Sequence, residues 1–306
     1  MESIKNFSQL TEHLSKQSIK LKVVVVCAND SHSEYAIHRA LKEGFVEFTL
    51  IGDSNFLEKF PALKAYSDNI TMIHVDDPDE AARMAVKFVK EGKADLLMKG
   101  IINTDNLLRA ILDKENGILP QGNLLTHLAV IEIPTYHKLL FFTDSAVIPY
   151  PTLEQRVTMI KYAINACNSF GIEKPKVALI NFTEKINPKF PTSIDYVEIV
   201  KMCNEGVFGN AIVDGPQDTR TACEKESGDI KGISSPVDGD ADVLIFPNIE
   251  AANTFYKSVS LFAKAEMAGV LQGTVCPVVL TSRSDTGLSK YYSLCMACLQ
   301  ACSKKL

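Results

Sequence analysis

Runs of apolar residues alternate with amphipathic stretches along most of the chain. Lys22–Cys27 is an almost continuous run of valines, which predicts a buried parallel strand, and residues 33–43 beyond it have helical periodicity. Similar runs predict strands at 48–52, 70–75 and 94–100. Because strands and helices alternate, the pattern predicts a parallel sheet with right-handed crossovers.

The middle of the chain departs from this alternation. Leu128–Ile133 and Leu139–Thr143 are separated only by Pro134–His137, and this spacing predicts an antiparallel hairpin. Beyond the hairpin the alternation resumes, with helices predicted at 152–170, 192–204, 251–267 and 288–303 and strands at 177–181, 211–215, 241–246 and 278–281. The fold class is therefore α/β, and the hairpin indicates two domains between which the chain crosses more than once.

Composition and charge exclude several classes of protein. A chain of 306 residues can form two domains with a full core, and its net charge of −5 lacks the basic excess of a nucleic-acid binder. No apolar run reaches the roughly 18–20 residues that span a bilayer, and the first residues lack the apolar region of a secretory signal. The eight cysteines lie mostly in apolar segments, so we expect a protein of the reducing cytoplasm.

Polar residues gather at the end of the strand predicted at 94–100. Lys99 is followed by a helix that begins near Asn103 or Thr104, either of which can cap it. The first N–H groups of such a helix favour anions, and Arg109, just over one turn inside, can add a bidentate contact to phosphate. The same residues also suit an ordinary capped helix with a solvated arginine.

Two further strand ends carry polar side chains. Asp144 and Ser145 follow the buried run of the hairpin directly. Ser282, Arg283 and Asp285 follow the last predicted strand, and they combine a hydroxyl, a guanidinium and a carboxylate. Such groups can stabilise a developing charge, hold an oxyanion and accept a proton, although an ordinary turn and a salt-bridged surface loop would have the same composition.

The common cofactor and metal motifs are missing from the sequence. It contains no G-x-G-x-x-G after the first strand, no P-loop, no H-E-x-x-H and no G-x-S-x-G. Cys295, Cys298 and Cys302 share one face of the last predicted helix, but no second pair of ligands is near them. Core or interface packing explains these cysteines better than zinc binding does.

A set of separate segments occurs in a characteristic order between about Lys20 and Cys298. They are Leu97–Thr104 with Leu108–Ala110, Phe142–Ala146, Pro175–Ala178, Glu184–Lys189, Ala211–Pro216, Ser235–Val243, Asn253 with Tyr256–Ser258, and Leu280–Asp285. In this order they resemble the phosphate acyltransferases, the phosphate acetyl/butyryl transferase family. Glu184–Lys189 and Thr281–Asp285 are more similar to the butyryl branch than to the acetyl branch.

The resemblance implies a fold and a reaction. It implies two α/β domains of the isocitrate and isopropylmalate dehydrogenase type with a cleft between them, usually in a homodimer. The first domain would comprise residues 1–124 plus 270–306 and the second residues 125–269. The implied reaction is reversible transfer of a short-chain acyl group, most consistent with butyryl, between CoA and phosphate in a ternary complex. No metal and no tightly bound cofactor are implied, because CoA and acyl-CoA are substrates.

The resemblance also implies roles for individual residues. Ser282 and Arg283 fall on the pair that handles phosphate and CoA, and Arg109 falls on the arginine after the family's Gly-x-x-x-Thr turn. Our hypothesis gives Arg109 and Arg283 the phosphate oxygens, Ser282 a hydrogen bond to the thiol or carbonyl, and Asp285 the role of base. Further contacts to phosphate or CoA are expected from Lys99, Asn103, Thr104, Asp144, Ser145 and Lys257.

The sequence departs from the acetyl branch at two places. The aspartate proposed as base in that branch lies seven positions after the site serine, where this chain has Ser289, so Asp285 is the nearest carboxylate. A further substrate arginine ahead of the Lys99 strand has no obvious counterpart. Acetyl, propionyl and branched acyl groups therefore stay open as substrates.

Two rival functions remain to be compared. A metal-dependent dehydrogenase on the same fold would need a cluster of aspartates, and Asp238, Asp240 and Asp242 are the candidates, although no cofactor loop accompanies them. A non-catalytic acyl-CoA sensor would bind acyl-CoA without turning it over. The presence of both Ser282 and Arg283 favours the enzyme.

Overall fold

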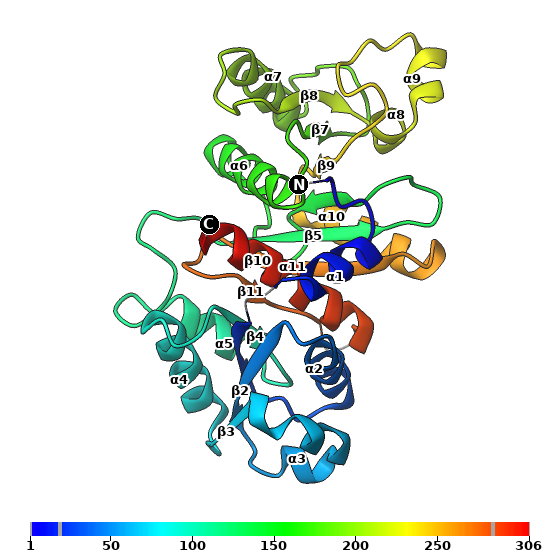
Figure 1. Ribbon diagram of the computed structural model, residues 1–306. Helices are drawn as coiled ribbons and strands as arrows, with labels where there is room; N and C mark the ends of the chain where they lie inside the picture. Colours follow the sequence, from blue (N-terminus) through cyan, green and yellow to red (C-terminus); the bar gives the residue numbers. More distant parts are fainter. Residues whose placement is uncertain (1, 18–19, 283–284, 306) are drawn as a thin grey trace. The chain divides into compact units, whose positions relative to one another are not determined.

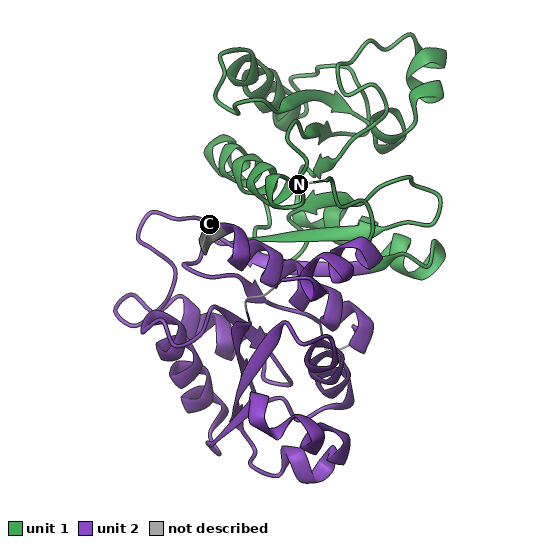
Figure 2. Cartoon of the chain, in the orientation of Figure 1, with its two compact units in different colours: residues 1–6, 126–266 green, residues 7–125, 267–306 purple. Residues whose placement is uncertain are grey.

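The computed structural model describes residues 2–17, 20–282 and 285–305 and forms two compact units (Figures 1 and 2). Unit 1 comprises residues 1–6 and 126–266, and unit 2 comprises residues 7–125 and 267–306. Residues 1–6 thus belong to the unit of residues 126–266, whereas the predicted domain ranges put them in the first domain. The domain ranges themselves stay a prediction.

Unit 2 contains a mixed sheet in the order β3-β2-β1-β4-β11-β10, in which every neighbouring pair except β10–β11 is parallel. Its strands are β1 (Leu21–Val26), β2 (Val46–Gly52), β3 (Ile70–His74), β4 (Leu96–Lys99), β10 (Glu266–Gln272) and β11 (Val278–Val279). Val23–Val26 of β1 are all buried, as expected for a strand covered on both faces.

The helices of unit 2 cover both faces of this sheet. They are α1 (Phe7–Ser15), α2 (Ser31–Glu43), α3 (Phe56–Lys59), the 3-10 helix η1 (Pro61–Asn69), α4 (Pro78–Lys90), α5 (Thr104–Ile111) and α11 (Gly287–Lys305). Helices α4 and α5 pack against each other on one side of the strands, and α2 lies on the other side, where it packs against α11 (Figure 1). Each helix that follows a parallel strand therefore begins at the carboxyl edge of the sheet.

Unit 1 contains strands in the order β5-β6-β9-β7-β8. Its strands are β5 (Thr126–Glu132), β6 (Leu140–Thr143), β7 (Lys176–Ile180), β8 (Ile212–Gln217) and β9 (Val243–Ile245), and its helices are α6 (Leu153–Ser169), α7 (Pro191–Asn204), α8 (Thr219–Cys223), α9 (Lys225–Lys231) and α10 (Ile249–Phe262). Strands β5 and β6 are antiparallel, which confirms the predicted hairpin, and the other neighbouring pairs are parallel.

The predicted helix at 251–267 is wrong over its last five residues. Helix α10 ends at Phe262, Lys264 has a φ of 53°, and Glu266–Gln272 forms strand β10, which pairs with β11. The apolar run of residues 267–271 is buried all round in this strand. A short apolar run has no periodicity that distinguishes a buried strand from a buried helix. The sequence pattern therefore predicted one long helix where the structure has helix α10 followed by strand β10.

Among the described residues, no helix is both long and apolar enough to cross a membrane. This finding matches the absence of a long apolar run in the sequence.

Candidate functional site

The carboxyl edge of the sheet in unit 2 carries two of the three strand ends that we expected to be functional, those after β4 and β11, and beside them the loop after β1. Strand β4 lies between β1 and β11 and is parallel to both, with Lys99 beside Val26 and Met98 beside Val279. The loops that follow these strands therefore meet at one edge, which is where open α/β sheets bind ligands. These loops are residues 27–30 after β1, residues 100–103 after β4 and residues 280–282 after β11.

The loops after β1 and β4 are in backbone contact at Gly100. The Gly100 N–H donates to Val26 O, and the Ile101 N–H donates to Cys27 O, both at 2.8 Å. A β-carbon on Gly100 would lie 2.3 Å from Cys27 O, so no other residue fits there without moving the backbone. Cys27 itself has a φ of 54°, in the left-handed region. The chain is thus folded tightly around the end of β4.

Lys99 places a cation inside this edge. It is only 1% exposed, and its Nζ donates to Gly100 O at 3.2 Å. Burial and the charge of Asp77 raise the pKa of the Cys27 thiol, whereas the Lys99 ammonium lowers it by less. Cys27 is therefore a thiol rather than a thiolate nucleophile at neutral pH. A buried ammonium at the rim of the sheet favours an anionic ligand.

Helix α5 begins as expected, with Asn103 as N-cap and Thr104 as its first residue. The Asn103 side chain forms no capping hydrogen bond with the first turn, so Asn103 occupies the cap position through its backbone conformation alone. The N-terminus of α5 is thus oriented toward the carboxyl edge, with its N–H groups not covered by a capping side chain.

Arg109 lies in the last turn of α5, beside the N-terminus of α4. Its Nη1 is 3.7 Å from Asp79 Oδ2, and its side chain is 70% exposed. Asn106 donates to the same carboxylate at 2.6 Å. Arg109 and Asp79 line a pocket of about 650 Å³ between α4 and α5. A pair this exposed is weak, so an incoming phosphate can replace Asp79 as the partner of Arg109.

Ser282 and Asp285 are joined by two hydrogen bonds, and Asp285 lies just before α11. Asp285 Oδ2 accepts the Ser282 N–H at 2.7 Å, and the Asp285 N–H donates to Ser282 O at 3.2 Å. The hydroxyl of the preceding Thr281 is buried and has no hydrogen-bond partner within the described ranges. Arg283, the other predicted member of this group, lies outside the described residues. The structure therefore brings the predicted serine and carboxylate together at the edge of the sheet.

Asp144 and Ser145 belong to unit 1, where they follow β6. Asp144 is only 2% exposed, and its carboxylate accepts hydrogen bonds from the Thr126 hydroxyl and from four backbone N–H groups, those of residues 127, 146, 147 and 148, at 2.7–3.3 Å. Ser145 Oγ lies 3.3 Å from His127 Nδ1, and Ser145 O accepts from Asn253 at 2.9 Å. These contacts assign Asp144 a role in holding the loop together.

Lys257 lies on the exposed side of α10, also in unit 1. Its ammonium is 4.6 Å from the centre of the Tyr256 ring, a cation–π contact with an aromatic neighbour in the same helix. The flexible side chain remains accessible to an anion in solvent.

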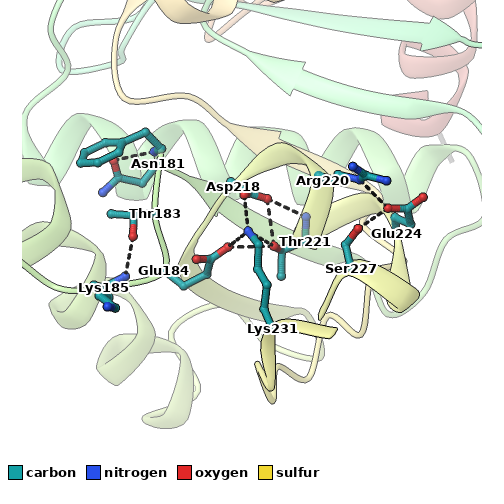
Figure 3. A network of polar contacts seen from close by, with 11 residues as sticks. Asn181, Thr183, Glu184, Lys185, Asp218, Arg220, Thr221, Glu224, Ser227 and Lys231 are labelled. Atoms are coloured by element: carbon teal, nitrogen blue, oxygen red, sulfur yellow. Dashed lines mark hydrogen bonds and ion pairs between the residues drawn. The ribbon is translucent and has the colours of Figure 1, made fainter. Parts of the chain in front are cut away.

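A polar network that our sequence analysis missed lies at the carboxyl edge of β7 and β8 (Figure 3). Glu184 accepts hydrogen bonds from the Thr221 hydroxyl and from Lys231, both at 2.8 Å, and Lys231 also pairs with Asp218. Burial opposes ionisation of Glu184, but the hydrogen bonds from Lys231 and Thr221 hold its pKa below the usual value. The network fastens α8 and α9 to the loop after β7. Only the Glu184–Lys189 motif indicated this place in the sequence.

The aspartates required by a rival dehydrogenase lie at the opposite, amino edge of the strands. Asp240 pairs with Lys138 and Lys176 at 2.8 and 3.0 Å, and Asp242 pairs with Lys138 at 2.7 Å. Their charges are thus balanced by two lysines. Throughout the described ranges, no group of three or more His, Cys, Asp or Glu side chains is arranged to hold a metal ion.

Replacing Asp144 tests whether this residue is structural or binds substrate. We expect Asp144→Asn to lower the free energy of unfolding by about 2–4 kcal/mol, because an amide nitrogen would face backbone donors in a buried site. Ser145→Ala, the control, removes one weak contact and should cost less than about 1 kcal/mol. Urea denaturation followed by circular dichroism measures both. An Asp144→Asn variant of unchanged stability that had lost its catalytic activity would instead place the carboxylate on substrate.

Comparison with known proteins adds independent evidence. Residues 64–298 match the sequence model described as phosphate acetyl/butaryl transferase. A phosphate butyryltransferase from Clostridium acetobutylicum is 37% identical over 303 residues, which cover 98% of this chain and 100% of that protein. A phosphate acetyltransferase from Thermotoga maritima is 38% identical over 280 residues, which cover 92% and 95% respectively.

A solved structure agrees with these relatives. The crystal structure of a branched-chain phosphotransacylase from Enterococcus faecalis matches with a TM-score of 0.83 at 32% identity, covering 92% of this chain and 99% of that chain. The resemblance found in the sequence is thereby confirmed: the chain belongs to the phosphate acetyl/butyryl transferase family.

Proposed function

We propose that the protein is a phosphate acyltransferase that transfers a short-chain acyl group, butyryl by preference, reversibly between CoA and inorganic phosphate. The observation that carries the proposal is full-length similarity to enzymes of both branches of the family, with a butyryltransferase 37% identical along almost the whole chain. The meeting of Lys99, Ser282 and Asp285 at one edge of unit 2 supports the same conclusion.

The proposed chemistry follows from the charges involved. An oxygen of phosphate attacks the thioester carbonyl, whose oxygen becomes an oxyanion, and the C–S bond then breaks to release CoA as a thiolate that takes up a proton. Because phosphate is a dianion, cations must offset its charge, and we assign this role to Arg109, Arg283 and Lys99. Holding both substrates in one complex lowers the barrier by up to about 7–11 kcal/mol.

The reverse direction needs a proton acceptor. A free thiol has a pKa of about 8.5, so a carboxylate near the CoA sulfur accelerates attack on the acyl phosphate. We assign this role to Asp285, one of whose oxygens already accepts the Ser282 N–H. Ser282 would hydrogen-bond the thiol or the carbonyl. Asn103, Thr104, Ser145 and Lys257 complete the proposed contacts to phosphate or CoA.

The proposal extends to fold type, cofactors and location. It includes two domains of the isocitrate and isopropylmalate dehydrogenase type, residues 1–124 plus 270–306 and 125–269, with a cleft between them. It includes no tightly bound cofactor and no metal, with CoA and acyl-CoA as substrates. Because none of the eight cysteines forms a disulfide, as in proteins of a reducing compartment, we also propose a cytoplasmic location.

Phosphate-dependent release of CoA tests the proposed reaction. The purified protein is given acetyl-, propionyl-, butyryl- and isobutyryl-CoA with and without phosphate, and a thiol reagent follows the free CoA. We expect release that requires phosphate and is fastest with butyryl-CoA. If the release of CoA is fastest with acetyl-CoA, the proposed reaction stands, but the preferred acyl group is acetyl rather than butyryl. Tight CoA binding without release from any substrate would identify the protein as a sensor.

Arg109 has a matched control in the same pocket. Arg109 and Arg83 both line it, each lies 3.7 Å from an aspartate near the start of α4, and their side chains are 70% and 65% exposed. If Arg109 holds phosphate, Arg109→Ala should lower kcat/KM for phosphate by about 100-fold, while Arg83→Ala changes it less than about twofold. Equal effects of the two substitutions would show that the pocket charge alone matters.

We also propose that the protein forms a homodimer through unit 1. Apolar side chains at the loop after β7 and on α7 form an exposed stripe, which we call the α7 stripe: Phe182, Ile186, Phe190, Ile194 and Val197. Such a patch marks an interaction surface more often than free solvent. The family resemblance indicates a second copy as its partner.

Sedimentation velocity measures the oligomeric state. We expect the native protein to sediment at twice the 33.7 kDa of one chain, and Ile194→Asp to sediment as a monomer because a charge would be buried in the interface. Val275→Asp replaces an equally exposed apolar side chain outside the α7 stripe and should leave the dimer intact. A native monomer, or a dimer insensitive to Ile194→Asp, contradicts the proposal.

A further inference from the structure

Helix α11, which begins just after Asp285, packs closely along α2. A β-carbon on Gly287 would lie 2.8 Å from the Cβ of Tyr35, so the start of α11 approaches α2 as nearly as a glycine allows. Four residues further on, the Tyr291 hydroxyl hydrogen-bonds Glu43, near the other end of α2, and the Arg39 guanidinium lies 4.3 Å from the Tyr291 ring. The beginning of α11 thus contacts α2 at two places, Tyr35 and the last turn.

Between these two contacts, Lys290 places an ammonium group in a buried site. Its side chain is only 4% exposed, its Nζ donates to Ser33 Oγ at 3.2 Å, and the same atom lies 3.7 Å from Asp30 Oδ1. Ser33 Oγ in turn donates to Asp30 Oδ2 at 2.6 Å. Asp30 is the N-cap of α2 and accepts the His32 and Ser33 N–H groups. Lys290 is therefore bound to the first turn of α2, in the loop that follows β1.

The charged groups around Lys290 come from several elements. Burial lowers the pKa of its ammonium, and the charges of Asp30 and Asp285 oppose that shift. Strand β4, which also packs against α11, ends in the cation Lys99, and α1 on the other side of α11 carries Glu12 and His13. A buried lysine with two carboxylates acting on it costs free energy that a methionine there would not. Such groups are found where function requires them.

We propose that Lys290 is a positioning residue of the acyl-transfer site, one that fixes the start of α11, and with it Asp285, against the first turn of α2. The Lys290 N–H donates to Thr286 O at 3.1 Å, so the residue that anchors α11 to α2 also closes the first turn after Asp285. Displacing this turn would move Ser282 and the proposed base together. The proposal rests on the acyltransferase function proposed above.

The test compares the wild type with Lys290→Met, Lys290→Arg and Tyr291→Phe, assayed with butyryl-CoA and phosphate. This direction has no free CoA thiol among the reactants, so thiol titration does not obscure the pH profile. Methionine keeps the volume and removes the charge, and arginine keeps the charge. Tyr291→Phe is the matched control, because it removes the other polar contact between α11 and α2 without touching the turn.

We expect Lys290→Met to lower kcat by about 10- to 100-fold, with KM for both substrates within about threefold of the wild type. The wild-type kcat should fall with rising pH as the ammonium loses its proton, over a range below that of an ordinary lysine because burial lowers its pKa, and this alkaline decrease should be missing in both Lys290 variants. Lys290→Arg should recover most of the activity. Tyr291→Phe should keep both the rate and the pH profile.

Several outcomes would overturn the proposal. If Lys290→Met keeps the wild-type kcat and the alkaline decrease, Lys290 has no role in the site. If Tyr291→Phe loses as much kcat as Lys290→Met does, Lys290 contributes only to the packing of α11 on α2. If Lys290→Met does not fold, Ser33→Ala replaces it, since loss of the hydroxyl contact should lower kcat a few-fold at unchanged thermal stability. An unchanged kcat in Ser33→Ala then counts against the proposal. A wild type that releases no CoA refutes the acyltransferase function instead, so the two failures are distinct.

Discussion

The contact between Gly100 and Cys27 is the constraint on which the rest of the site depends. Two parallel strands, β1 and β4, end side by side, and their loops cross with only a glycine hydrogen between the backbones. This crossing fixes the positions of Lys99, the N-terminus of α5 and the loop that leads to Asp30. A parallel sheet brings loops to one edge, but only a residue without a side chain lets them touch there.

The carboxyl edge of the unit 2 sheet contains buried cations and carboxylates that already accept hydrogen bonds. Lys99 and Lys290 are both buried, and Asp30 and Asp285 each accept backbone N–H groups. Burial alone would raise the pKa of Asp30, but the Ser33 hydrogen bond and the Lys290 charge lower it on balance. The edge therefore holds its positive charges in place before any anion arrives. Such preorganisation is what transfer of a phosphate-borne acyl group requires.

The sequence predicted most of the strands because buried parallel strands are continuous apolar runs, as Val23–Val26 show. It failed at β10, whose apolar run adjoins a helix. Ser282 and Asp285 were predicted together because they are close in sequence, and the structure joins them. Lys290 and Ser33, which form a hydrogen bond, lie 257 positions apart in the sequence. No local sequence pattern predicts a contact over such a separation. One related feature of the sequence is that Lys290 shares a helical face with Leu294 and Cys298, both of which are buried, so its burial could have been expected.

Ser289 belongs to the cap of α11 rather than to the acid–base chemistry proposed above. The Ser289 N–H donates to the Thr286 hydroxyl at 3.1 Å, and the two hydroxyls lie 3.3 Å apart. Thr286 thus caps the first turn of α11, and Ser289 takes part in that cap. A serine hydroxyl is too weak a base to accept a thiol proton at neutral pH. Asp285 is the carboxylate directly before this cap, and in the function proposed above it is the base that Lys290 holds in place by anchoring α11.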